Sequence, residues 1–365
     1  MLEPEPLQLI GRTEVRSGRR TLVYFSGCDY FRLAREPRVS AALTFSLHQA
    51  GLSVAASRLT TGNHALYQNL EAALARFFGA ETAVVLPDGY LAGLAVTQAL
   101  AGEFTHALLD EFAHGALRDA ARMLDCPIHS FQHRAPTALN RLMKKLGENC
   151  RPLVLTDGMF SHDGSVAPLP AYLKLLPRGG MILVDDAHGA GILGQHGQGA
   201  LEHCGVNRER IIQCATLSKA FGTYGGVVLA ARQLREKILA RSRVLVGTTP
   251  MPLPLAGAAL ASLEILRREP ARRKRLFQNS IFLREKARAA GWEIIETPGP
   301  IVRLPALNKM KTAALKKKLL AAGIYPPYLK YPGASAGGIF RFVVSSEHSI
   351  EQLARLAGVL AAFKQ

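Results

Sequence analysis

The sequence contains few cysteines, one tryptophan and far fewer acidic than basic residues. Its five cysteines are odd in number and form no CxxC pair; they are Cys28, Cys126, Cys150, Cys204 and Cys214. This usage excludes a disulfide framework and a cysteine zinc site, and it is typical of free thiols in a reducing compartment. We therefore expect a cytoplasmic protein that binds no metal.

Long apolar runs are also missing. Charged residues, proline or glycine interrupt every apolar stretch within about a dozen residues, whereas a membrane-spanning helix needs about 20. The first residues, MLEPEPLQLIGR, contain acids and prolines in place of the apolar core of a secretory signal. With 48% hydrophobic and 20% charged residues, the 365-residue chain has a globular composition and can form a large domain plus a smaller one.

Basic residues outnumber acidic ones, 45 to 28, which gives a net charge of +17. Such a charge would attract anionic ligands, for example a coenzyme A thioester or nucleic acid. A solvated basic surface would have the same composition, and we favour it because the charge is spread along the chain, with short clusters only at 272–275 and 309–318. No aromatic-interleaved basic motif supports nucleic-acid binding.

Short apolar runs alternate with helical patterns in the first two thirds of the chain. The runs are aliphatic or β-branched and are bounded by Gly, Pro or polar residues: Thr82–Leu86, Pro152–Thr156, Met181–Asp185, Ile211–Thr216 and Gly226–Ala230. The clearest helix pattern covers His64–Phe78, with its leucines and phenylalanines on one face and Gly79 as its cap. Strands alternating with helices predict an α/β fold with a mostly parallel sheet covered on both faces.

The pattern changes after Thr249. Three prolines precede a long helix pattern that ends near Arg268, and short strand and helix patterns follow, with strands expected at 292–296, 301–304 and 339–344. They predict an α+β domain of roughly a hundred residues. We expect three parts: an N-terminal segment 1–35, a large domain 36–247, and a C-terminal domain 248–365 that includes the connecting helix.

Lys219 is the first candidate for chemistry. It lies in TLSKAFGTYGG, directly after an apolar run, where small residues and glycines allow close approach of the backbone. A lysine partly withdrawn from water binds its proton less tightly and becomes an amine nucleophile. Taken alone, such a lysine is more often a solvated loop residue.

The second candidate is the stretch VDDAHGAG, residues 184–191, at the end of another apolar run. Two carboxylates and an imidazole are costly there unless they have partners. A pyridoxal phosphate (PLP) ring would supply them, because a buried carboxylate stabilises its protonated pyridine nitrogen; Asp185 suits this role, and His188 suits the phenolic oxygen. Two alternatives stay open: a metal site of Asp185, Asp186 and His188, or a strand-end aspartate that caps the following turn.

Both stretches follow predicted strands, and ligands of open parallel sheets bind at the carboxyl ends of strands. Together, VDDAHGAGILGQHGQG and TLSKAFGTYGG resemble the α-oxoamine synthase family of fold-type I PLP enzymes. The likeness extends from about Tyr24 to the C-terminus. It implies a fold-type I PLP transferase, a homodimer with a shared active site, Lys219 bound to PLP as a Schiff base, and Asp185 beside the pyridinium nitrogen.

Other stretches match the family in the same order, among them FSGCDYFRL at 25–33 and SRLTTGNH at 57–64. By this resemblance, Gly89 and Tyr90 form the turn whose backbone amides meet the cofactor phosphate, as amides at a helix start suit an anion. The resemblance also implies that His114 stacks on the PLP ring, that Ser161 lies near the phenolic oxygen, and that Thr216 contacts the phosphate.

The remaining implied roles concern the substrate and the neighbouring subunit. Arg341 matches the arginine that clamps the amino-acid carboxylate, a natural use of a planar guanidinium. Tyr328 stands where a threonine often meets the substrate, and Cys28 stands where an asparagine helps hold the carboxylate. Thr249, or its neighbour Thr248, matches a residue that reaches the phosphate of the partner subunit.

Several positions depart from the family pattern. Cys28 is a poor hydrogen-bond donor, so Arg341 would bind the carboxylate with less help. Leu52–Ala56 replaces a glycine-rich loop, and Asp88 replaces a small hydroxyl residue beside the phosphate turn, which brings like charges together. The segment Tyr325–Gly338 is also unusual, and the family's N-terminal helix is largely absent. We therefore expect an intact cofactor site and an altered substrate site.

The resemblance implies condensation of a small α-amino acid, alanine or glycine, with an acyl-CoA and loss of CO2 and CoA. In that reaction Lys219 would remove the Cα proton, and His114 would stack on the ring. Two alternatives remain. One is another PLP reaction on the same fold, either transamination or decarboxylation. The other is a PLP-fold binding protein without catalysis.

Overall fold

The computed structural model describes residues 6–330 and 337–364. The chain forms two compact units: Glu36–Phe160 with Val166–Glu269, called here the large unit, and Met1–Arg35 with Ser161–Ser165 and Pro270–Gln365, called the small unit. The expected division placed residues 248–269 with the C-terminal domain. In the structure they group with the large unit because α10 (Leu253–Arg268) packs against α1 (Pro37–Ala50) and α2 (Ala65–Phe78).

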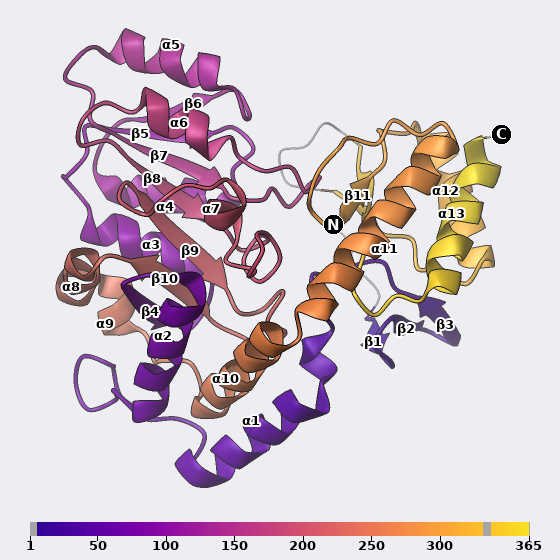
Figure 1. The fold of residues 1–365 in the computed structure, drawn as a ribbon, viewed down its shortest axis with the longest axis horizontal. Helices are drawn as coiled ribbons and strands as arrows, with labels where there is room; N and C mark the ends of the chain where they lie inside the picture. Colours follow the sequence, from indigo (N-terminus) through magenta and orange to yellow (C-terminus); the bar gives the residue numbers. More distant parts are fainter. Residues whose placement is uncertain (1–5, 331–336, 365) are drawn as a thin grey trace. The chain divides into compact units, whose positions relative to one another are not determined.

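A seven-stranded sheet forms the centre of the large unit, with strand order β4-β10-β9-β8-β7-β5-β6 (Figure 1). β10 is antiparallel to both of its neighbours, and every other pair is parallel. This confirms the predicted α/β fold with a mostly parallel sheet. The strands are β4 (Thr82–Leu86), β5 (His106–Asp110), β6 (Ile128–Phe131), β7 (Pro152–Asp157), β8 (Met181–Asp185), β9 (Ile211–Thr216) and β10 (Gly226–Ala230).

Helices cover both faces of this sheet. Consecutive residues of its central strands are therefore buried, for example throughout β7. The predicted helix at 64–78 is confirmed as α2: the Nδ1 atom of His64 accepts the Leu66 amide at its start, and Gly79 ends it in a left-handed conformation. The other helices of the large unit are α3 (Tyr90–Ala99), α4 (Gly115–Ala121), α5 (Pro136–Leu146), α6 (Leu169–Leu175), α7 (Ala200–His203), α8 (Arg232–Arg241) and α9 (Arg243–Gly247).

Within the described residues, the small unit combines two three-stranded sheets with three α-helices. One sheet contains β1 (Gln8–Leu9), β2 (Glu14–Ser17) and β3 (Arg20–Val23), and the other has the order β11 (Ile301–Arg303), β13 (Ile339–Val343), β12 (Tyr328–Leu329). The helices are α11 (Pro270–Ala289), α12 (Lys309–Ala321) and α13 (Ile350–Lys364). The prediction of a strand at 292–296 is wrong, because this segment pairs with no strand in the described part of the chain. Trp292 instead packs in the core, and its Nε1 donates to the Leu360 carbonyl.

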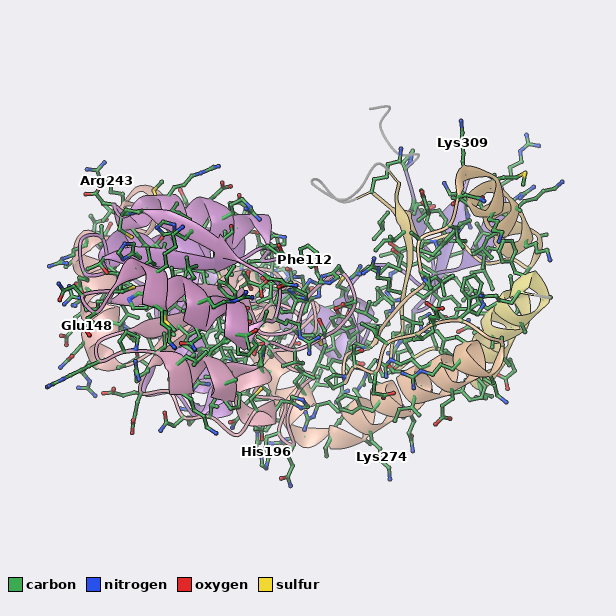
Figure 2. The ribbon with its side chains drawn as sticks, turned by 90° about the horizontal axis from the view of Figure 1, so that it is seen from above. Phe112, Glu148, His196, Arg243, Lys274 and Lys309 are labelled. Atoms are coloured by element: carbon green, nitrogen blue, oxygen red, sulfur yellow. The ribbon has the colours of Figure 1, made fainter. Side chains whose placement is uncertain are left out.

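Basic side chains lie on the surfaces of both units. Arg243, Lys274 and Lys309 are exposed and point away from the protein (Figure 2). In the cluster at 272–275, however, Arg272 and Arg273 are buried, so this cluster is only partly a solvated surface. In the described part of the chain, no helix combines the length and the apolar character that a membrane crossing requires.

The contact between α1 and α10 depends on a missing side chain at Gly257. A Cβ atom there would lie 2.7 Å from Cβ of Ser46 and 3.3 Å from the Ala42 carbonyl oxygen. The neighbouring helix would therefore have to move. In α13, by contrast, a Cβ atom at Gly358 would meet nothing within 4 Å.

We predict opposite effects for two glycine-to-alanine changes in helices. Gly257→Ala should lower the free energy of unfolding by roughly 1–3 kcal/mol, because overpacking costs more than helix propensity returns. Gly358→Ala should raise it by about 0.5–1 kcal/mol, because alanine favours the helix. Urea denaturation of the two variants measures both changes, and equal effects of the same sign would contradict the close packing at Gly257.

Candidate active site

The parallel strands β7, β8 and β9 end in register at one edge of the sheet. Asp157 pairs with Asp185, and Asp185 pairs with Cys214, so their side chains project from the same face. A cavity of about 240 Å³ lies at this edge, entirely within the large unit. Its lining contains Asp88, Gly89, Tyr90, His114, Ala116, Asp157, Asp185, Ala187, His188, Thr216, Ser218 and Lys219. Seven of the residues predicted from the sequence therefore meet at one cavity.

Lys219 reaches the cavity from a tight turn after β9. The Leu217 amide donates to the Gly225 carbonyl at 2.8 Å, and the Gly222 amide donates to the Lys219 carbonyl at 2.9 Å. These bonds fold residues 217–225 back on themselves and fix the backbone of Lys219 beside the strand end. The glycines noted in the sequence thus serve the turn that presents the lysine.

Asp185 ends β8 and also lines the cavity. One of its oxygens, Oδ1, accepts the Ala187 amide at 3.0 Å, which is the turn cap that one sequence alternative predicted. The metal alternative is not supported, because the ligand atoms of Asp185, Asp186 and His188 form no cluster that could hold an ion. Asp186 points to the other side, where its Oδ2 accepts the Ala200 amide and Nε2 of Gln213, at 2.8 and 2.6 Å. Burial raises the pKa of Asp186 to about 7.

Asp157 was missed by the sequence analysis. It is 3% exposed, and its Oδ1 accepts the backbone amide of His114 at 2.9 Å. Burial, and then the negative charge of neighbouring Asp185, raise the pKa of Asp157 well above its ordinary value. The carboxyl at this strand end is therefore a fixed support for the segment that carries His114.

His114 caps the start of α4. Its Nδ1 accepts the Ala116 amide at 3.2 Å, so the neutral ring carries its proton on Nε2. The Tyr90 ring lies edge-on to it, with 6.5 Å between ring centroids. Because Asp157 holds its backbone and the cap holds its ring, His114 keeps one orientation at the cavity wall.

The turn before α3 is shaped as a cradle. A Cβ atom at Gly89 would lie 2.8 Å from both Cβ and Oγ1 of Thr216, so only glycine lets this turn approach β9 so closely. The Thr216 hydroxyl in turn bonds Oγ of Ser218 at 2.8 Å. Backbone amides at a helix start together with hydroxyl groups are the donors that a phosphate group prefers. The cavity therefore fits PLP, with a phosphate cradle at one end and an amine and a carboxylate on its walls.

Four further predicted residues lie together within the small unit. Arg341 on β13 is buried, its Nε donates to the Ser161 carbonyl at 2.5 Å, and its Nη2 lies 3.6 Å from Sγ of Cys28. Tyr328 on β12 pairs with Phe340, the neighbour of Arg341, and its hydroxyl accepts the Gly338 amide at 2.8 Å. Residues 331–336 of the unusual segment Tyr325–Gly338 lie outside the described residues.

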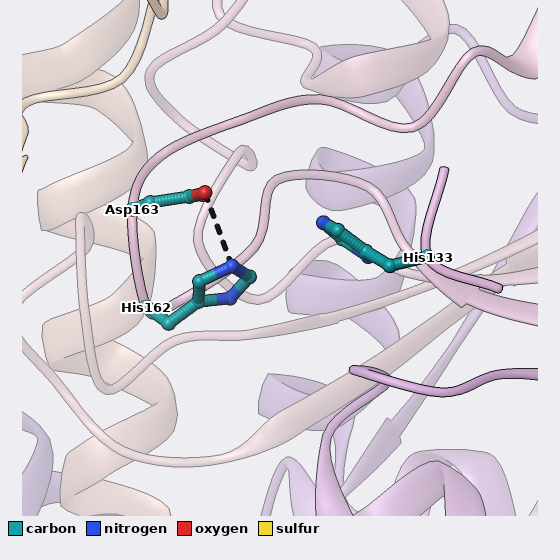
Figure 3. Close-up of side chains that lie close together, drawn as sticks. All are labelled: His133, His162 and Asp163. Carbon is teal, nitrogen blue, oxygen red and sulfur yellow. Dashed lines mark ion pairs between the residues drawn. The ribbon is translucent and has the colours of Figure 1, made fainter. Parts of the chain in front are cut away.

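The segment that follows Ser161 is fixed by an ion pair. Nε2 of His162 lies 3.0 Å from Oδ2 of Asp163 (Figure 3). Although burial opposes it, the hydrogen bond and charge of His162 lower the pKa of Asp163 to about 2. Asp163 also accepts the Ser165 amide at 2.8 Å, so its side chain closes a turn within the short stretch 161–165.

Two predicted positions lie apart from the cavity. Thr249 follows α9 and does not belong to the cavity lining, and the hydroxyl of its neighbour Thr248 bonds the Val244 carbonyl at 2.6 Å.

Within Leu52–Ala56, the loop that replaces glycines, Ala55 has a φ of 49°. This left-handed conformation is strained for a residue with a Cβ atom, and it is the backbone that glycine would adopt freely.

His348 is a second residue that the sequence analysis missed. It is buried and stacks on Phe25, with 4.1 Å between ring centroids. Its Nδ1 accepts the Ser345 amide at 2.9 Å, and its Nε2 lies 3.2 Å from the Tyr24 carbonyl oxygen. Burial lowers its pKa to about 3. The neutral ring thus joins the segment before Cys28 to the segment after Arg341.

Known proteins resemble this chain in sequence and in fold. The sequence model of the aminotransferase class I and II family matches residues 41–360. An 8-amino-7-oxononanoate synthase from Thioalkalivibrio sulfidiphilus is 34% identical over 95% of this chain and 89% of its own length. A Sphingomonas wittichii serine palmitoyltransferase is 29% identical, with a TM-score of 0.93, and the match covers 99% of this chain and 92% of that one.

A structure of SPT with PLP as an internal aldimine is 27% identical to this chain, with a TM-score of 0.91. The match covers 98% of this chain and 90% of that one. The likeness therefore extends over both units.

We predict that His348 makes stability depend on pH. Its pKa is about 3 in the folded chain and near 6.5 when unfolded, so the unfolded chain binds the proton first and stability falls as pH drops below 6.5. Between pH 7.5 and 5.0 this residue should cost up to about 2 kcal/mol. Urea denaturation should show that His348→Gln removes this part of the loss.

His203→Gln is the matched control, because His203 lies exposed in the large unit. The free energy of unfolding of this variant should depend on pH as strongly as that of the parent chain. If His348→Gln and the parent chain lose the same free energy of unfolding over this pH range, then His348 is not the buried neutral group that causes the loss.

Proposed function

Because this chain belongs to the aminotransferase class I and II family and, within it, to the α-oxoamine synthases, we propose that it condenses a small α-amino acid with an acyl-CoA. The amino acid is alanine or glycine, and CO2 and CoA leave. The observation that carries the proposal is the meeting of Lys219 and Asp185 at one cavity, at the ends of neighbouring strands.

PLP, when bound, supplies an electron sink for the negative charge that develops at Cα of the amino acid. Around it, Asp185 would keep the pyridine nitrogen protonated, and His188 would bond the phenolic oxygen. The Gly89 and Tyr90 amides and the Thr216 hydroxyl would hold the phosphate, and the fixed ring of His114 would stack on the cofactor. Ser161 would act near the phenolic oxygen, as the family resemblance implies.

Lys219 would have two tasks. Its Nζ would hold the cofactor covalently in the resting enzyme, and the Lys219 amine, once free, would take the Cα proton of the amino acid. General-base help of this kind is worth roughly 10²–10⁴-fold in rate. The tight turn after β9 serves both tasks, because it keeps the lysine backbone at one place while the side chain moves.

Arg341 would bind the carboxylate of the amino acid. The bonds to the Ser161 carbonyl and to Cys28 fix the plane of its guanidinium group, which favours a two-point contact with a carboxylate. Tyr328, on the adjacent strand, would limit the size of the side chain that the site accepts. Cys28 supplies a weaker donor than the asparagine of the family pattern.

We also propose that the enzyme is a cytoplasmic homodimer. Among the described residues, none of the five cysteines forms a disulfide, as expected in a reducing compartment. Helix α1 and the loop after it expose large apolar side chains, with Phe45 66% and Leu52 65% exposed, and such a surface suits a second copy of the chain. In the dimer, Thr249 would reach the phosphate held by the partner. Sedimentation of the purified protein tests the oligomeric state.

We predict that Lys219→Ala abolishes the visible absorbance of lysine-bound PLP and lowers turnover by at least about 10²-fold. Absorbance spectra of the purified holoprotein and release of free CoA thiol measure the two effects. Lys174→Ala, at an exposed lysine on α6, is the matched control and should change neither. A variant without Lys219 that keeps the absorbance band would overturn the proposal.

The thiol assay also separates the alternatives. CoA release that needs both the amino acid and the acyl-CoA agrees with the condensation. A keto acid or CO2 formed without acyl-CoA would indicate transamination or simple decarboxylation. PLP binding without turnover of any amino acid would indicate a binding protein.

We predict that Cys28→Asn lowers KM for the amino acid about 5- to 10-fold with little change in kcat, because an amide donor adds one hydrogen bond to the carboxylate. Steady-state kinetics with varied amino acid and saturating acyl-CoA measure this. Cys126→Ser, at a cysteine of the large unit outside the cavity lining, should leave KM unchanged. An unchanged or raised KM in Cys28→Asn would argue against a role of Cys28 beside the substrate.

A further inference from the structure

The start of α3 already holds an anion that belongs to the chain itself. Oδ1 of Asp88 accepts the backbone amide of Tyr90 at 2.7 Å, and Asp88 lines the cavity together with Gly89, Tyr90 and Lys219. This amide is one of the donors that a cofactor phosphate would use at the helix start. The carboxylate therefore stands where a phosphate oxygen would bond.

Asp88 also interacts with Tyr224. The Asp88 carboxylate lies close enough to the hydroxyl of Tyr224, in the turn that follows Lys219, to raise the pKa of that hydroxyl. Tyr224 is 46% exposed, so its side chain has room to follow a movement of the carboxylate. The backbone of Asp88 has no such freedom, because its carbonyl group packs directly against Gly226. The contact is so close that a Cβ atom at Gly226 would collide with this carbonyl.

These contacts make Asp88 and a bound phosphate compete. One amide hydrogen cannot serve two anions at full strength, and two negative charges at hydrogen-bond distance from the same donor repel each other. A phosphate can take the Tyr90 amide only if the Asp88 side chain turns away from it. The Tyr224 hydroxyl is the donor that can keep the carboxylate after it turns.

We propose that Asp88 is an internal competitor for the cofactor phosphate, and that its transfer from the Tyr90 amide to Tyr224 accompanies cofactor binding. The proposal rests on the proposed function, since it assumes that PLP binds in this cavity. Asp88 then lowers the affinity for phosphorylated ligands and leaves the affinity for unphosphorylated ones unchanged. The lower affinity for phosphorylated ligands depends on the negative charge of Asp88. Its other role, as the acceptor that caps the turn at the Tyr90 amide, does not need that charge.

The test uses variants that separate charge from shape. Asp88→Asn keeps an oxygen that accepts the Tyr90 amide but removes the charge, and Asp88→Ser supplies a small hydroxyl group. Cofactor-free full-length protein is titrated with PLP and, separately, with pyridoxal, which lacks the phosphate. Asp88→Asn should bind PLP about 5- to 30-fold more tightly, the size of a removed like-charge repulsion, and pyridoxal with unchanged affinity. Inorganic phosphate should also compete with PLP more strongly in this variant.

Tyr224→Phe tests the second half of the proposal. It should weaken PLP binding in the parent chain, because the displaced carboxylate loses its partner, and it should have no effect in the Asp88→Asn background. Asp119→Asn is the matched control: it removes an exposed charge that bonds the hydroxyl of the same Tyr90 but lies outside the cavity lining. Its affinity for PLP should equal that of the parent.

The outcomes also distinguish this inference from the proposed function. If the parent chain binds PLP through Lys219 but Asp88→Asn and Asp88→Ser bind it no more tightly, Asp88 is no competitor and the proposed function stands. Equal gains for PLP and pyridoxal would overturn the phosphate-specific role. If neither ligand binds the parent chain at the cavity, the proposed function itself fails. Thermal denaturation of each cofactor-free variant confirms that it is folded.

Discussion

Two carboxylates, the buried Asp157 and the half-buried Asp185, stand side by side at the ends of β7 and β8, and the rest of the site is arranged around them. Parallel pairing in register puts Asp157 and Asp185 on one face, so the sheet itself brings the negative charges together. Burial and the charge of Asp185 raise the pKa of Asp157, which reduces the repulsion. Asp157 is then a support for His114, and Asp185 is the group that can face a cationic ring. A cofactor with a protonated nitrogen is the natural partner of such a pair.

Much of this fold could be predicted from the sequence because burial leaves a local pattern. The five predicted strands of the large sheet are continuous aliphatic runs, and all five are present. β5 and β6 were missed because HALLD and IHSF are short and contain polar residues, so neighbouring strands define them more than their own composition does. The segment 292–296 has the composition of a strand but lacks a partner, and pairing is what distinguishes a strand from an extended chain.

The site residues also divide into those that the sequence predicts and those that it does not. Lys219, Asp185 and the Gly89 turn stand in short stretches with recognisable spacing, and the structure brings them to one cavity. Asp157 and His348 leave no such signal, because their partners His114 and Tyr24 lie 43 and 324 positions away in the chain. Their roles arise from strand register and tertiary packing. The consequence of Asp88 was likewise visible only as a departure from a pattern until its bond to the Tyr90 amide was seen.

The small unit is assembled from three separate stretches of the chain, and this has a consequence for biosynthesis. The Tyr24 carbonyl meets His348, and the Val23 amide bonds the Gly323 carbonyl, so residues 23 and 24 find their partners only about three hundred positions later in the chain. The large unit is complete once residue 269 has emerged. Domains generally fold as units during synthesis. Translation thus orders the two units in time: the sheet with its cavity forms first, and the small unit folds only after the residues around Arg341 have been made.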